Sequence, residues 1–213
     1  MDEEQAVLNF FAQAENLPLA LSVADQVDIT RQELNHAFWK SLAERMTAYA
    51  PEWSVTFTED RNAADCLVGL HLEPAQKQTF YLRPLLEQQY LGEALRIYFG
   101  LMWSAPPTPD LMRLDSIIKL RDALHKAGFK NNEKFLAWQW TPYHPRRRDF
   151  LLRFSRDANA LLGEVTVLMD TLLVAHAEAL HSANAALRDA PRTAAISLAQ
   201  LRTPAVNNKL DSL

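Results

Sequence analysis

The residues of this chain that could do chemistry fall into three groups, and the first group is acidic. Glu59, Asp60 and Asp65 lie close together in a polar stretch between two apolar segments. Clustered carboxylates can hold a divalent cation or act as general acid and base. Asp is also frequent in turns for backbone reasons alone. An enzyme with an unrecognised acidic site is therefore one hypothesis for this chain.

The second group, the cysteine and the histidines, forms no metal or nucleophile motif. Cys66 is the single cysteine, and the six histidines show neither H-x-x-x-H nor H-E-x-x-H spacing. The five-residue offset from Cys66 to His71 puts the two side chains on opposite faces of one strand. Five scattered glycines and the lack of a phosphate-cradling loop disfavour a nucleotide site. We predict no catalytic residue, no metal and no cofactor.

The third group is basic and is concentrated in one part of the chain. Residues 111–156 carry 11 Lys and Arg against 4 Asp and Glu, whereas residues 1–110 carry 7 against 16. Aromatic residues are interleaved, and phosphate contact combined with base stacking is how sequence-tolerant nucleic-acid binders work. In the alternative interpretation, these charges face solvent or the acidic N-terminal half. The candidate nucleic-acid-binding residues are Arg146, Arg147, Arg148, Arg153, Arg156, Lys130 and Lys134.

The elements that must position these groups begin with two helices. Residues 6–12 have an apolar side, and Pro18 should end this first helix because the residue before a proline disfavours the helical conformation. A second helix is predicted to begin near Thr30, where Thr30 and Glu33 form a capping box. Apolar residues then recur every fourth position, and the helix should end before Pro51.

Four antiparallel strands are predicted next, because apolar and polar residues alternate and the connections are short and polar. The stretch 88–93 is equally consistent with a loop. The predicted strands cover residues 53–57, 66–72, 79–86 and 95–103.

The C-terminal half is predicted to be helical. One helix is capped by Asp110 and stops at Gly128, and an aromatic connector follows. A long helical stretch covers residues 147–187, with an interruption near 157–159. Four apolar residues of this stretch form a seam that can pack against another helix, and we call them the apolar seam. They are Leu161, Val165, Leu168 and Leu172.

Together these elements predict an α+β fold: a roughly four-stranded antiparallel sheet packed by an N-terminal helix, followed by a helical C-terminal half with one long helix. The predicted segments are an N-terminal helical part, a helix with the sheet, a helical region and a loosely held tail. They span residues 1–27, 28–105, 110–187 and 188–213.

Composition is that of a globular protein, with 48% hydrophobic and 23% charged residues in 213 positions. The N-terminus is acidic, unlike a signal peptide, and no apolar run approaches the roughly 20 residues of a membrane span. We therefore expect a cytoplasmic protein without a membrane partner.

Two stretches resemble the accessory region that follows the catalytic core in some bacterial proteins of the PD-(D/E)XK nuclease superfamily. One runs from Phe38-Trp39-Lys40-Ser41-Leu42 to Ile97-Tyr98-Phe99-Gly100-Leu101. The other runs from Ala127-Gly128-Phe129 through Trp138-Gln139-Trp140 to the helices of Arg153-Phe154 and Met169. Pro109-Asp110 is present, but no Asp/Glu-x-Lys tripeptide occurs in the chain. Such nucleases need those carboxylates and that lysine to hold Mg²⁺ and activate water. The resemblance thus implies an accessory module without the nuclease site.

The leading hypothesis is a non-enzymatic protein-binding or regulatory module of a bacterial intracellular system associated with nucleases or defence. It would act through a protein partner or by self-association. The main alternative is a nucleic-acid-binding accessory protein that uses the basic segment 113–156.

Overall fold

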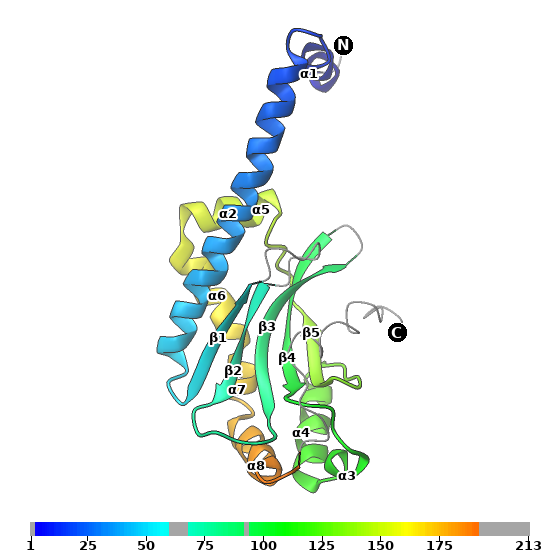
Figure 1. Cartoon of the computed structure of the whole chain (residues 1–213), viewed down its shortest axis with the longest axis vertical. Coiled ribbons are helices and arrows are strands. Elements are labelled where there is room, and N and C mark those ends of the chain that lie inside the picture. Colours follow the sequence, from blue (N-terminus) through cyan, green and yellow to red (C-terminus); the bar gives the residue numbers. More distant parts are fainter. Residues whose placement is uncertain (1–2, 60–67, 92–93, 192–213) are drawn as a thin grey trace.

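The structure is a computed structural model that describes residues 3–59, 68–91 and 94–191 (Figure 1). Its centre is a five-stranded sheet in the order β1-β2-β3-β4-β5, in which every neighbouring pair is antiparallel. The mixed α+β class and the antiparallel sheet are therefore confirmed. The strands are β1 Trp53–Glu59, β2 Val68–Pro74, β3 Leu82–Leu91, β4 Ala94–Trp103 and β5 Phe135–Trp140.

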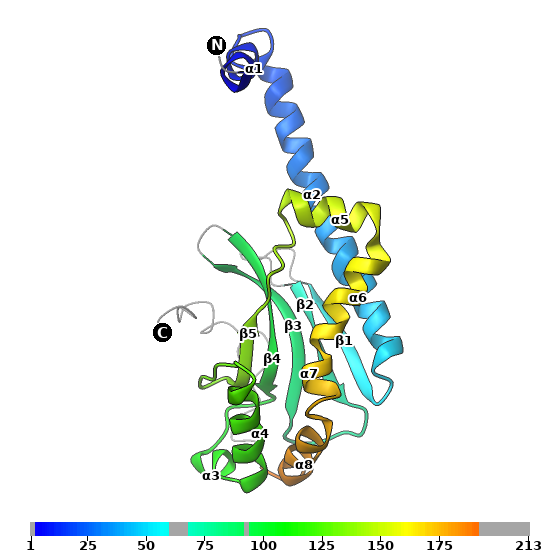
Figure 2. The same cartoon turned by 180° about the vertical axis from the view of Figure 1, so that it is seen from behind.

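Two described helices precede the strands, two lie between β4 and β5, and four follow β5. They are α1 Glu3–Phe11, α2 Leu17–Tyr49, α3 Pro109–Met112, α4 Asp115–Lys126, α5 Arg148–Arg156, α6 Ala158–Leu168, α7 Asp170–Leu173 and α8 Ala177–Leu187. Figures 1 and 2 show that the lower half of α2, together with α4, α6, α7 and α8, lies on one face of the sheet. The upper half of α2, with α1, projects away from this body.

One hydrophobic core fills the space between the sheet and the helices. Phe38 and Trp39 of α2 are fully buried there, as are Leu120 of α4 and Leu161 of α6. Strands on both sides of residue 105 face this core, and β5 pairs with β4. The prolines at 106, 107 and 109 therefore mark a turn within one folded unit, although the sequence suggests a subdomain boundary there.

The prediction of four strands is wrong by one. Residues 135–140 form β5, whereas the sequence suggested a connector, because the stretch Phe135-Leu136-Ala137-Trp138-Gln139-Trp140 lacks the alternation of a half-buried strand. Its first four residues are all buried. The third predicted strand also extends further, since residues 88–91 belong to β3 and form a hairpin with β4.

The long helix lies at the opposite end of the chain from its predicted place. α1 ends at Phe11, before Pro18 as predicted, but α2 begins at Leu17 and runs through the predicted start near Thr30. Pro18 lies in the first turn of α2, where a missing N–H costs nothing. Thr30 does not cap a helix; its hydroxyl donates to the carbonyl oxygen of Gln26 at 2.8 Å. The predicted end before Pro51 is confirmed, since α2 ends at Tyr49.

The C-terminal helical stretch is divided into four helices. α5 ends at Arg156, and the carboxylate of Asp157 accepts from the amide of Ala160 at 3.0 Å, so Asp157 caps α6. The interruption predicted at residues 157–159 is thus confirmed. Gly128, with φ of +90°, ends α4 in the left-handed conformation as predicted. Thr108, and not Asp110, provides the cap before that region.

Candidate protein-interaction surface

The most exposed part of the described chain is its N-terminal helical region, residues 3–33, which we call the arm. α1 has no buried residue, and the buried residues of α2 begin at Asn35. Figures 1 and 2 show from two sides that the arm projects beyond the sheet and the other helices. About half of α2 is therefore a helix without packing against the body.

The arm is also the main site of exposed apolar side chains. Ten of its large hydrophobic residues are between 42% and 68% exposed. Monomeric proteins rarely show contiguous apolar surface larger than about 300–600 Å² unless it has a function. These residues are Val7, Leu8, Phe10, Phe11, Leu17, Leu19, Leu21, Val23, Val27 and Ile29.

A hydrogen-bonded turn connects the two helices of the arm. The side-chain amide of Asn16 donates to the carbonyl oxygen of Phe10 and to the Oε1 atom of Gln13, each at 3.0 Å. The backbone amide of Leu17 donates to the carbonyl oxygen of Gln13 at 2.9 Å, and Pro18 lies in the first turn of α2. The turn is therefore a defined local structure that holds α1 at the tip of α2.

The arm carries charge of one sign until its last turn. No Lys or Arg precedes Arg31 in the sequence. Arg31 itself pairs with Asp28 at 3.2 Å, one helical turn away. The part of the arm that precedes Arg31 is therefore both acidic and apolar. The described acidic residues before Arg31 are Glu3, Glu4, Glu15, Asp25 and Asp28.

The base of the arm is fixed to the body by aromatic packing. The ring of Phe38 on α2 lies edge-on to Phe150 and Phe154 of α5, with centroids 4.9 and 5.7 Å apart. Further along α2, the hydroxyl of Tyr49 donates to the carboxylate of Asp170. This hydrogen bond raises the pKa of Tyr49 to about 12. The arm is thus mounted on a helix whose lower half is anchored at several points.

The predicted nucleic-acid-binding residues fall into two separated groups. The backbone amide of Trp103 donates to the carbonyl oxygen of Lys134. The backbone amide of Ile97 donates to the carbonyl oxygen of Tyr143, which shortly precedes Arg146 in the chain. Ile97 and Trp103 are six residues apart on β4, or roughly 20 Å. Lys130 lies 5.8 Å from the ring centroid of Trp138, which pairs with Gly100 midway between these two positions. Lys134 and the arginines therefore lie towards opposite ends of β4.

The two groups also differ in how available their charges are. Lys134 is 9% exposed, and burial lowers the pKa of its ammonium group. Arg153 donates to both carboxylate oxygens of Glu164 at 2.7 Å, and Arg147 pairs with Asp149 at 3.3 Å. Arg146 is half-buried just before α5.

One exposed side of α5 remains outside these ion pairs. Arg148, Leu152 and Arg156 are spaced at i, i+4 and i+8, so they lie along one side of the helix. Arg148 and Arg156 are exposed and form no ion pair with a described residue, and Leu152 is 41% exposed. We call these three residues the α5 stripe. It combines two cations with one apolar side chain.

The Arg153–Glu164 pair makes a prediction about acidity. The hydrogen bond from Arg153 holds the pKa of the Glu164 carboxyl below its ordinary value, and Tyr143 adds a second donor at 3.2 Å. Because the pKa of Glu164 is lower in the folded state, the pair stabilises the fold at pH values above the ordinary Glu pKa. This stabilisation is lost as the pH falls through the folded-state pKa of Glu164. A ¹³C NMR titration of Arg153→Gln should show the Glu164 pKa move up towards the ordinary value. Arg156→Gln is the control, and an equal shift in both variants would contradict the assignment.

The apolar seam predicted as an interaction surface lies inside the molecule. Leu161, Val165 and Leu172 are fully buried, and Leu168 is partly buried against the same core. α6 packs against the lower half of α2. The seam does pack against another helix, as its spacing predicts, but that helix belongs to the same chain.

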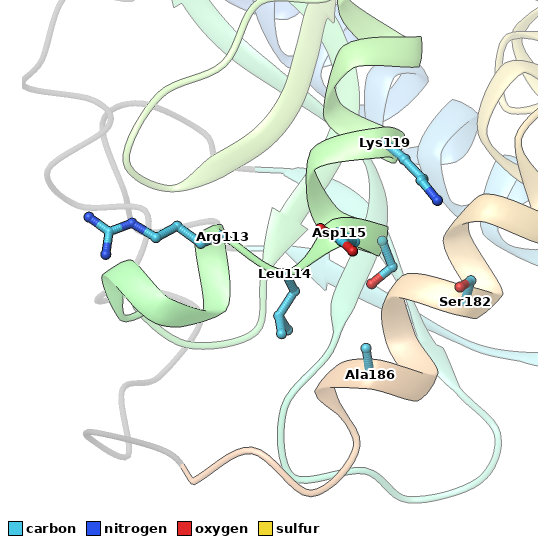
Figure 3. Close-up of a pocket in the computed structure, with 7 residues that line it drawn as sticks. Arg113, Leu114, Asp115, Lys119, Ser182 and Ala186 are labelled. Atoms are coloured by element: carbon cyan, nitrogen blue, oxygen red, sulfur yellow. The ribbon is translucent and has the colours of Figure 1, made fainter.

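A pocket lies between α4 and α8 (Figure 3). Asp115 and Lys119 of α4 line it together with Ser182 of α8, while the side chain of Arg113 points away in Figure 3. The lining has one carboxylate, Asp115, and one amine, Lys119, and it contains neither histidine nor cysteine.

Part of the predicted acidic site and the single cysteine lie outside the described residues. Asp60, Asp65 and Cys66 lie outside them, as does the predicted tail from residue 192 onward. Within the described ranges, no group of three or more His, Cys, Asp or Glu side chains could hold a metal ion. A buried carboxylate that sequence reasoning did not single out, Glu87, accepts a hydrogen bond from the hydroxyl of Tyr98 on the neighbouring strand. Burial raises the pKa of that tyrosine.

Comparisons with known proteins do not connect the chain to a family. No protein family, no curated protein and no solved structure matches it. In the part of the chain that the structure describes, no helix has both the length and the apolar character required to cross a bilayer.

Sequence reasoning assigned residues 1–27 to a helical segment but did not identify the arm as a surface. The available signal was the run from Glu3 to Thr30, which has many apolar residues and no cation. Apolar residues on several sides of one helix are typical of a helix that becomes enclosed.

Proposed function

We propose that this chain is a protein-binding module whose binding element is the arm, residues 3–33. The observation that carries the proposal is the exposure of ten large apolar side chains on a helical region without contact to the core. Burial of such side chains in an interface gains about 25 cal/mol for each Å² removed from water. The resemblance to accessory regions of nuclease-superfamily proteins would assign the module to bacterial systems that contain nucleases.

The mounting of the arm supports the same function. Phe38 and Trp39, directly beyond the arm, are fully buried, so the position of the arm is determined by the core. A rigidly mounted helix loses less conformational entropy on binding than a disordered segment does. Binding through the arm would therefore carry a partner into a fixed position relative to the sheet.

A paired substitution tests whether the arm binds protein. The wild-type chain and a Val23→Glu/Val27→Glu variant are immobilised separately. The proteins that each one retains are then compared, including free copies of the chain itself. Val167 is a suitable control, because this valine is 61% exposed on α6, outside the arm. We expect the double variant to lose retention and Val167→Glu to keep it. Equal retention by all three proteins would refute the proposed function.

A further inference from the structure

We infer that the occupant of the arm is the arm of a second copy of this chain, paired antiparallel. This inference rests on the proposed function and specifies its partner. Isolated helices of about 12–15 residues are marginal in water, and most helical stability in proteins comes from packing an apolar face. The upper half of α2 has no such packing within the described chain, and a second arm would supply it.

The spacing of apolar and acidic residues fits a two-helix pair. Leu19, Val23 and Val27 follow one another at four-residue intervals and form one stripe along α2. At 100° per residue, Asp25 and Asp28 lie on the opposite side of the helix from this stripe. Two arms can therefore pack by their stripes while their carboxylates stay apart. Antiparallel pairing centred near Asp25 sets Val23 of one copy opposite Val27 of the other.

Antiparallel pairing also brings opposite charges together. The tip of each arm carries Glu3, Glu4 and Glu15, and it would lie at the base of the other arm. α5 packs at that base, since Phe150 contacts Phe38 (Figure 2). The α5 stripe presents its two cations and Leu152 at this end of the arm. A parallel pair would instead bring the acidic tips of both copies together.

The size of the arm matches an interface of ordinary dimensions. Specific interfaces bury about 800 Å² and involve about 20–30 residues on each side. The arm extends over residues 3–33, and its exposed apolar side chains are distributed from Val7 to Ile29. In a dimer with twofold symmetry, both copies contribute the same surface to the interface. The arm alone is therefore sufficient to form a closed dimer.

Light scattering on the full chain is the first test. Wild-type protein should have twice the mass of one chain, Val23→Glu/Val27→Glu should have the mass of one chain, and Val167→Glu should behave as wild type. A wild-type monomer, or a double variant that remains a dimer, overturns the inference. If the wild type is a monomer but its arm still retains another protein, the proposed function stands and the inference alone fails.

Cysteine pairing then tests the direction and register of the arms. In a Cys66→Ser background, Val23→Cys and Val27→Cys proteins are oxidised separately and as a mixture. We expect the mixture to form covalent dimers faster than either protein alone, because residue 23 faces residue 27 of the other copy. Equal or faster oxidation of the separate proteins overturns the antiparallel register.

Charge reversal tests the contact between tip and base. Arg148→Glu/Arg156→Glu should weaken dimerisation about tenfold at low salt. Mixing this variant with Glu3→Lys/Glu4→Lys/Glu15→Lys should restore the association. An unchanged dimerisation constant, with loss of binding to a DNA oligonucleotide instead, would assign the α5 stripe to nucleic acid and overturn this part of the inference.

Discussion

Gly100→Ala should destabilise the fold by at least about 2 kcal/mol, because the position has no room for a side chain. Gly100 of β4 pairs with Trp138 of β5. A Cβ atom at Gly100 would meet the carbonyl oxygen of Ala137, and it would lie 2.8 Å from the Cα atom of Trp138. These are backbone atoms, so β5 would have to move away from β4. Urea unfolding followed by tryptophan fluorescence measures the loss.

A second glycine provides a control with the opposite expectation. Gly163 lies inside α6, and a Cβ atom there would meet the Nη2 atom of Arg45 at 3.4 Å, the flexible end of a side chain. Ala is favoured over Gly in a helix interior by about 1 kcal/mol. Gly163→Ala should therefore be neutral or stabilising. Equal destabilisation by both substitutions would contradict the close approach of β4 and β5.

Trp39→Ala should have the larger effect, a loss of about 3–5 kcal/mol in the free energy of unfolding. Trp39 is fully buried, and its indole Nε1 donates to Oε1 of Gln88 on β3 at 2.6 Å. The substitution therefore creates a cavity and removes a buried hydrogen bond between α2 and the sheet. Calorimetry or urea unfolding gives the change in stability.

The control for Trp39 lies on the same helix. Thr47 is exposed on α2, and Thr47→Ala should change stability by less than about 0.5 kcal/mol. Because Trp39 lies within two helical turns of the end of the arm, its loss should also increase amide hydrogen exchange at the base of the arm. A Trp39→Ala protein as stable as Thr47→Ala would show that α2 does not depend on this contact.

Much of the fold follows from local sequence patterns. The alternation from Trp53 to Phe57 predicts β1, and Gly128 ends a helix because it tolerates the left-handed conformation. β5 was missed because its apolar residues do not alternate. Its strand conformation depends on pairing with β4, which is more than thirty residues away in the chain. Such pairing is a tertiary property that local periodicity does not contain.

The interaction surface was harder to predict for a related reason. Val23 and Val27 are apolar residues four positions apart on one helix, and so are Leu161 and Val165. Both pairs have the spacing of core positions. In the structure, the first two are 54% and 42% exposed, whereas the other two are fully buried. Which of two similar stripes meets the sheet depends on the whole fold. Sequence spacing alone therefore placed the interaction seam on α6, whose apolar side chains pack inside the fold, whereas the surface proposed here lies on α2.

The most direct test of the account is the mass of the purified chain and of its Val23→Glu/Val27→Glu variant by size-exclusion chromatography with light scattering. One chain has a mass of 24.2 kDa. A dimer paired through the arms gives a wild-type mass of twice this value, and the double variant should have the mass of one chain. Identical masses for the two proteins would contradict this pairing.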